Sequence, residues 1–129
     1  MEDCLLDTHA FLWFINGSDD LSNKAKLYIE NPQNRKFISI ASFWKIAIKI
    51  SLGKLRLDMP FQELKLITAN NGFEILPLTF EHTDKLTTLD FHHKDPFDRL
   101  IIAQALTENL LVISKDTNFG YYSVKVIWD

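Results

Sequence analysis

The sequence predicts a three-layer α/β/α fold, in which a mostly parallel central sheet of about five strands is covered by helices on both faces. Three observations support this prediction. Short apolar runs recur along the chain, longer runs with helical spacing alternate with them, and the composition is 47% hydrophobic and 24% charged, as in globular proteins. Strands that are separated by helices pair in parallel and are buried on both faces. The expected strands are residues 4–6, 37–39, 73–76, 111–114 and 124–128.

The first strand, residues 4–6, is followed by two helices. Residues 8–15 are apolar almost all round, which is typical of a helix that is buried or covered by a partner. Ser22 is expected to cap the second helix, whose inward side should carry Leu27 and Tyr28. Three aromatic residues of the first helix suit core packing first and a partner segment second: Phe11, Trp13 and Phe14.

The middle of the chain predicts a strand at residues 37–39 and two further helices. The first of these helices ends at Gly53. The second begins at Pro60, because proline is tolerated at the first helical position. The inward side chains of the first helix are expected to be Phe43, Ile46, Ala47 and Ile50. Those of the second are expected to be Phe61, Leu64 and Ile67.

The last part of the chain continues the alternation of strands and helices. The strand at residues 73–76 is followed by a short helix that Thr79 caps, and Asp95 with Pro96 opens a strongly apolar helix. Residues 111–114 then form a buried strand, and residues 124–128 are expected at the edge of the sheet.

Length and charge limit the possible classes of protein. A chain of 129 residues, with no repeat or linker, is expected to be one domain over residues 1–129. Its net charge of −3 excludes a strongly basic nucleic-acid binder, so any RNA contact needs a local basic patch. The single Cys4, the lack of a signal peptide and the lack of an apolar run of about 20 residues predict a cytoplasmic protein outside the membrane.

Four aspartates occupy positions where the predicted sheet would bring them together. Asp7 ends the first strand, Asp116 follows the fourth, and Asp95 and Asp98 begin the long apolar helix. Ligands of open α/β sheets bind beyond the carboxyl ends of the strands. Carboxylates gathered there stay ionised only if a cation compensates them, and oxygen ligands favour Mg²⁺ or Mn²⁺.

Each aspartate also has a purely structural interpretation. Asp95 before Pro96 is a favourable helix N-cap, and Asp98 stands where the acid of a capping box would be. Asp7 could cap the helix at residues 8–15, and Asp116 could serve a turn. These interpretations remain open beside the metal site.

Other catalytic patterns are absent from the sequence. The glycines form no phosphate-binding loop, and cysteine and histidine do not have the spacing of a zinc site. A phosphoacceptor domain would need an aspartate near residues 75–77, where the chain has Ile-Leu-Pro. His92 and His93 lie in a polar connection and are expected to be solvated or to contact phosphate. The candidates for RNA binding are Lys49, Arg99 and His93.

Four segments together resemble the PIN-domain ribonucleases of the VapC type, in the order and spacing of that family. They span nearly the whole chain: residues 5–13 (LLDTHAFLW), 38–44 (ISIASFW), 95–105 (DPFDRLIIAQA) and 113–116 (ISKD). The resemblance implies a PIN-like α/β/α fold and a Mg²⁺- or Mn²⁺-dependent endoribonuclease. It also implies an RNA substrate, a homodimer and a cognate antitoxin. Asp7, Asp98 and Asp116 match the family's metal-binding acids, and Asp95 matches a frequent accessory acid.

Lys45 departs from the pattern of that family, which has a glutamate at this position. A cation there competes with a bound metal, and near the start of a helix it opposes the helix dipole. Three interpretations are open. The lysine inactivates the enzyme, or it pairs with Asp7 or Asp98 and replaces part of the metal charge, or it is solvated. We favour the first two, because the family glutamate points into the site.

Overall fold

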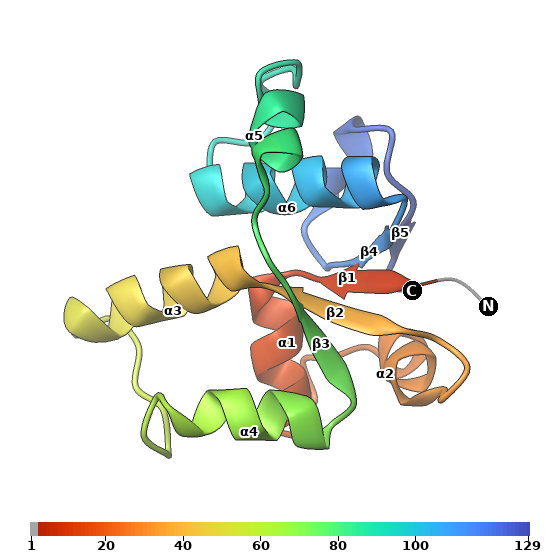
Figure 1. The fold of residues 1–129 in the computed structure, drawn as a ribbon. Coiled ribbons are helices and arrows are strands. Elements are labelled where there is room, and N and C mark those ends of the chain that lie inside the picture. Colours follow the sequence, from red (N-terminus) through yellow and green to blue (C-terminus); the bar gives the residue numbers. More distant parts are fainter. Residues whose placement is uncertain (1–2) are drawn as a thin grey trace.

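The computed structural model describes residues 3–129 and contains one five-stranded sheet (Figure 1). All neighbouring strands are parallel, and their order is β3-β2-β1-β4-β5. The strands are β1 (Cys4–Leu6), β2 (Lys36–Ser39), β3 (Phe73–Leu76), β4 (Leu111–Ile113) and β5 (Val126–Ile127). The predicted parallel sheet is therefore confirmed, with β5 at the expected edge.

Helices cover both faces of the sheet. In Figure 1, α5 and α6 lie on one side of it, and α1, α2 and α4 lie on the other. The helices are α1 (Thr8–Ile15), α2 (Asn23–Glu30), α3 (Ile40–Ser51), α4 (Glu63–Asn70), α5 (Phe80–Leu86), α6 (Pro96–Glu108) and the short 3₁₀ helix η1 (Thr117–Tyr121). This confirms the three-layer α/β/α fold. Within residues 3–129, no helix is both long enough and apolar enough to cross a membrane.

The predicted N-caps set the starts of three helices. The side chains of Ser22, Thr79 and Asp95 accept hydrogen bonds from backbone N–H groups in the first turns of α2, α5 and α6. Each bond satisfies an amide that has no partner inside the helix. Pro96 follows Asp95 at the start of α6, where its missing N–H costs nothing.

The core has one part on each face of the sheet, and β1 contributes to both. Leu5 packs with Ile101 and Ile102 of α6, whereas Cys4 and Leu6 belong to the opposite cluster. This alternation is the ordinary consequence of strand geometry. Burial raises the pKa of the Cys4 thiol to about 12, so the thiol is an unreactive core group.

One inward residue is wrong on each of two expected helix faces, whereas Tyr28 and Leu64 of the same faces pack in the core as expected. Leu27 of α2 is 70% exposed, and the buried residues of that helix are Ala25 and Ile29. Leu27 lies two positions from each of them, and residues two apart point to different sides of a helix. Helix α4 begins at Glu63 instead of Pro60, because the preceding residues form a turn in which Glu63 N–H donates to the Pro60 carbonyl, and Phe61 is exposed.

The aromatic residues of α1 are used within the chain. Phe11 is fully buried, Phe14 packs against Phe73, and Trp13 packs against Trp128. Core packing, the first interpretation of these aromatic residues, is therefore confirmed, although Trp13 and Phe14 stay partly exposed. A more exposed apolar row lies along α3 and its C-cap, at intervals of four residues: Ile40, Trp44, Ile48 and Leu52.

The order of the strands creates a switch point beside β1. From β1 the chain proceeds outward to β2 and β3, and it then returns to place β4 on the other side of β1. Loops diverge at such a point and leave room for a ligand beyond the carboxyl ends of the strands. Asp7 follows β1 and Asp116 follows β4, so both acids lie at this place.

Candidate metal centre

Asp7 is held at the end of β1 by two hydrogen bonds. Its Oδ1 accepts from the Ala10 N–H at 2.8 Å, which makes it the N-cap of α1, and its Oδ2 accepts from the Ser114 hydroxyl at 2.5 Å. Only 5% of the residue is exposed. Burial raises the pKa of Asp7 above its ordinary value, although these hydrogen bonds act in the opposite direction.

Ser114 connects the ends of the two central strands. Its hydroxyl donates to Asp7 and also accepts a hydrogen bond from the Asp116 N–H at 3.0 Å. Asp116 in turn caps η1, because its Oδ1 accepts from the Asn118 N–H at 2.9 Å. One buried hydroxyl thus fixes both strand-end acids, and capping leaves the second oxygen of Asp116 available for another partner.

The start of α6 contributes the other two acids. Asp95 caps the helix through its Oδ1, which accepts from the N–H groups of Phe97 and Asp98 at 2.8 and 3.2 Å. The capping-box interpretation of Asp98 is wrong. The N–H of Asp95, which a capping-box acid would accept, donates instead to Nδ1 of His93 at 3.1 Å. The Asp98 carboxylate is therefore directed to the site.

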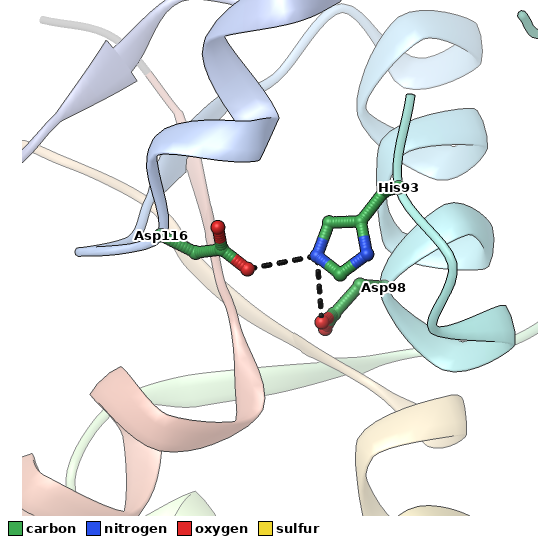
Figure 2. A group of neighbouring side chains, drawn as sticks. All are labelled: His93, Asp98 and Asp116. Atoms are coloured by element: carbon green, nitrogen blue, oxygen red, sulfur yellow. Dashed lines mark hydrogen bonds and ion pairs between the residues drawn. The ribbon is translucent and has the colours of Figure 1, made fainter. Parts of the chain in front are cut away.

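His93 lies between two of the acids, as Figure 2 shows. Its Nε2 is 2.8 Å from Oδ2 of Asp116 and 3.1 Å from Oδ2 of Asp98. The residue is 7% exposed, so the expectation of a solvated histidine is wrong. Two contacts bury it: its ring packs edge-on against Phe119, and its backbone N–H donates to the hydroxyl of Tyr122.

Lys45 lies inside the site and pairs with the accessory acid. Its Nζ is 2.7 Å from Oδ2 of Asp95, and the residue is only 7% exposed, so the solvated interpretation is wrong. The pairing interpretation named Asp7 or Asp98, and the structure gives Asp95 instead. Burial alone would raise the pKa of Asp95, but the hydrogen bond and charge of Lys45, with the amides of α6, bring it below its ordinary value.

Asp98 has no such compensation. Burial raises its pKa to about 6, and the negative charges of Asp95 and Asp7 add to this effect, while Lys45 and His93 oppose it. Ligand atoms of His93, Asp98 and Asp116 lie within 4.8 Å of one another. Burial thus outweighs the nearby positive charges, a further cation would stabilise the ionised acids, and carboxylate oxygens are hard donors. The residues present therefore fit a hard divalent cation.

The other predicted RNA contacts have different surroundings. The guanidinium of Arg99 donates to the carbonyl of Asp90 at 3.0 Å and lies over the ring of Phe91, so it holds the loop before α6. Lys49 is half-buried, one turn after Lys45 on α3. Partial burial lowers the pKa of His9 on α1, and the positive charges of Lys45 and Lys49 lower it further.

Two residues that contact the acids had no predicted part in the metal site. Ser114 lies in a segment of the family resemblance without a predicted role, and His93 was predicted only to be solvated or to contact an RNA phosphate. A signal for His93 was present, because it stands two residues before an Asp-Pro helix start. From that position its Nδ1 can accept the N–H of the N-cap residue, as it does in the structure.

Comparison with known proteins places these residues in a wider context. The family model of the PIN domain matches residues 4–125. No curated protein sequence matches the chain.

Several solved structures share the fold. A chain in the crystal structure of VapBC2 from Rickettsia felis, bound to a DNA fragment from their promoter, is 20% identical with a TM-score of 0.71, over 98% of this chain and 99% of that one. A chain of VapBC-1 from nontypeable Haemophilus influenzae is 17% identical with a TM-score of 0.67, over 97% of this chain and 96% of that one. VapBC-5 from Mycobacterium tuberculosis is described as a member of a family of toxin–antitoxin systems. Its chain is 19% identical with a TM-score of 0.64, over 100% of both chains.

Proposed function

The chain belongs to the PIN-domain family, and on that premise we propose that it is a metal-dependent endoribonuclease toxin of the VapC type, from a type II toxin–antitoxin module. One observation supports this most: at the switch point of the sheet, ligand atoms of Asp98, Asp116 and His93 lie within 4.8 Å of one another, and Asp7 is near enough for its charge to interact with both acids. Such a toxin would act on RNA in the cytoplasm.

These three acids would hold Mg²⁺ or Mn²⁺. When bound, such an ion activates water and offsets the negative charge that develops on a phosphodiester during in-line displacement. Residues of the chain would orient the acids and bind the RNA. Ser114 orients Asp7, the cap of η1 orients Asp116, and Lys49 offers a positive charge near the site for an RNA phosphate.

Lys45 weakens or inactivates this site in our proposal. Its ammonium neutralises Asp95 and replaces a carboxylate that the resemblance would place there, so the site has less negative charge for a cation. The second candidate function is a PIN-domain protein that binds RNA or an antitoxin without efficient cleavage. The buried, well-paired position of Lys45 favours it, because the lysine is accommodated as a stable part of the site.

We place the cognate antitoxin on the exposed row of α3. That row presents an unusually apolar surface beside the site, and Trp44 at its centre packs against Phe97 in the first turn of α6. A partner segment on α3 would therefore lie close to Asp95 and Asp98. A similar structure from Klebsiella pneumoniae is described as a toxin–antitoxin complex, and VapBC-5 as a member of a family of toxin–antitoxin systems, which supports an antitoxin as the partner. A homodimer, as in the resemblance, would complete the assembly.

Cleavage of a structured RNA with Mg²⁺ or Mn²⁺ tests the proposed function. We expect weak or no cleavage by the chain as it stands, and cleavage at least about tenfold faster by Lys45→Glu, because the added carboxylate strengthens cation binding. Lys65→Glu is the matched control, with the same change of charge at an exposed position of α4 that has no role in the site. It should not gain activity.

The outcomes separate the two candidates. Strong, equal, metal-dependent cleavage by the unaltered chain and by Lys45→Glu would show that Lys45 does not impair the enzyme. If Lys45→Glu is folded and binds metal but leaves RNA intact, the nuclease assignment itself is wrong.

A further inference from the structure

His93 makes contacts that neither of its expected roles explains. It belongs to the loop before α6, yet it is almost fully buried, and both ring nitrogens have partners. Its Nε2 is in contact with one acid from α6, Asp98, and one from the loop after β4, Asp116 (Figure 2). The imidazole therefore joins two elements that the chain brings together only at the site.

The hydrogen bonds determine which ring nitrogen carries the proton. The N–H of Asp95 donates to Nδ1, so Nδ1 presents a lone pair and has no hydrogen. In a neutral imidazole the hydrogen is then on Nε2. That Nε2–H donates to Oδ2 of Asp116, with Oδ2 of Asp98 in contact at 3.1 Å, and it leaves Nε2 without a lone pair for a metal ion. The same position is too enclosed to meet an RNA phosphate.

Both acids keep oxygen lone pairs that this hydrogen bond does not use. A carboxylate oxygen can accept an N–H and still bind a cation, and each acid also has a second oxygen. Carboxylates this close repel each other, and the Nε2–H between them, bonded to Asp116 and in contact with Asp98, offsets part of the repulsion without neutralising either one. Hydrogen-bond donors of this kind commonly orient the acids of metal sites.

We propose that His93 is a positioning residue: its Nε2–H donates to Asp116 and lies against Asp98, and the imidazole so holds the two acids in the arrangement that binds a divalent cation. It binds neither the cation nor the RNA itself. The inference rests on the proposed metal site, and it adds a residue that sets the geometry of the acids.

Two variants separate the two ring nitrogens. In His93→Asn, the amide oxygen stands at the place of Nδ1 and can accept from Asp95 N–H, but the side chain does not reach the acids. In His93→Gln, the amide nitrogen stands at the place of Nε2 and can donate to Asp98 and Asp116. Calorimetric titration with Mn²⁺, without RNA and at one fixed pH, should give an affinity for His93→Gln within about threefold of the unaltered chain. His93→Asn should bind about 10- to 100-fold more weakly.

His92→Asn is the matched control, because His92 is the exposed neighbour of His93 and its ring contacts Tyr121 and Tyr122. It should leave the affinity for Mn²⁺ unchanged. Equal affinities for His93→Asn and the unaltered chain would overturn the proposal. So would a nitrogen coupling from bound Mn²⁺, in electron spin echo spectra, that disappears in His93→Gln, because it would make His93 a metal ligand.

A measurement on the metal-free, unaltered chain remains decisive if a variant does not fold. The ¹⁵N spectrum of the histidine side chains should show His93 with hydrogen on Nε2 and none on Nδ1. The opposite tautomer would overturn the proposal. This readout needs neither metal nor RNA, so its failure is distinguishable from a failure of the nuclease assignment, which the cleavage assay tests separately.

Discussion

The two sides of the candidate site compensate their acids in different ways. On the α3 side, the full charge of Lys45 pairs with Asp95 and brings the pKa of that acid below its ordinary value. On the other side, the Nε2–H of His93 donates to Asp116 and lies against Asp98, and burial raises the pKa of Asp98 to about 6. The Lys45 ammonium neutralises its acid, which then attracts a metal ion less strongly. The imidazole of His93 aligns two acids, and both can still bind a metal ion.

The strongest test of this contrast is the affinity for Mn²⁺. Asp98→Asn should lower it by at least about 100-fold, because even the loss of a partner outside the ligand set commonly costs 10- to 100-fold. The double variant Lys45→Met/Asp95→Asn removes an ion pair of zero net charge from the other side of the site. It should change the affinity for Mn²⁺ by less than about threefold. Calorimetric titration measures both.

Asp90→Asn provides the control for loss of one negative charge, since its carboxylate is 88% exposed near the same loop. Asp7→Asn and Asp116→Asn should lower the affinity for Mn²⁺ to the same extent as Asp98→Asn. A double variant that binds Mn²⁺ as weakly as Asp98→Asn would show that the Lys45 side also holds the cation, and the contrast between the two sides would be wrong.

The second test concerns the stability of the metal-free chain. Asp95→Asn keeps a good helix cap but leaves the ammonium of Lys45, whose side chain is 9% exposed, without its partner. We expect the free energy of unfolding to fall by about 2 kcal/mol, since an unpaired buried charge is costly. Lys45→Met/Asp95→Asn should recover most of this loss. Denaturant unfolding gives both values.

The ion pair between Arg35 and Glu74 is the control, because it has similar geometry, at 2.9 Å, but is well exposed. Arg35→Met should not measurably change the melting temperature, as expected for a surface pair. If the double variant is as unstable as Asp95→Asn, the loss comes from the start of α6 and not from the stranded lysine.

Much of the fold was predictable because its signals are local. Apolar runs set the strands, and Ser22, Thr79 and Asp95 mark helix starts through bonds to residues two or three positions away. The inward face of a helix was harder to predict, because residues two positions apart in the sequence lie on different sides of the helix. Leu27 was assigned to the core for that reason and is exposed.

The acids of the site were also predictable, because each follows a strand or begins a helix. Their partners were not. His93 is buried by Tyr122 and Phe119, which are distant in sequence, and no local pattern fixes the path of its loop. Lys45 was expected to meet Asp7 or Asp98 and meets Asp95, a choice that depends on side-chain conformation within a crowded site.

The smallest expected effect comes from pH and acts on the His93 side. Asp98 has a pKa of about 6 in the folded chain, so it must lose a proton before it can bind Mn²⁺ through that site. Lowering the pH from 7.5 to 5 should therefore weaken binding by roughly tenfold through this group. Asp95, with a lowered pKa, should add nothing in this range. An affinity that is constant over this range would contradict the assignment of Asp98 as an uncompensated ligand.

Without metal, the same group should act on stability in the opposite direction. The ordinary pKa of Asp98 is 3.8 and its folded value is about 6, so between these values the folded chain holds a proton that the unfolded chain releases. The contribution of Asp98 to stability is therefore present below about pH 4 and is lost as the pH rises through about 6. Asp98→Asn cannot titrate, so its melting temperature should fall less than that of the unaltered chain across this window. If the melting temperatures of the two chains change with pH in parallel, burial does not perturb the pKa of Asp98. The two sides of the site would then differ only in whether Lys45 or His93 contacts the acids.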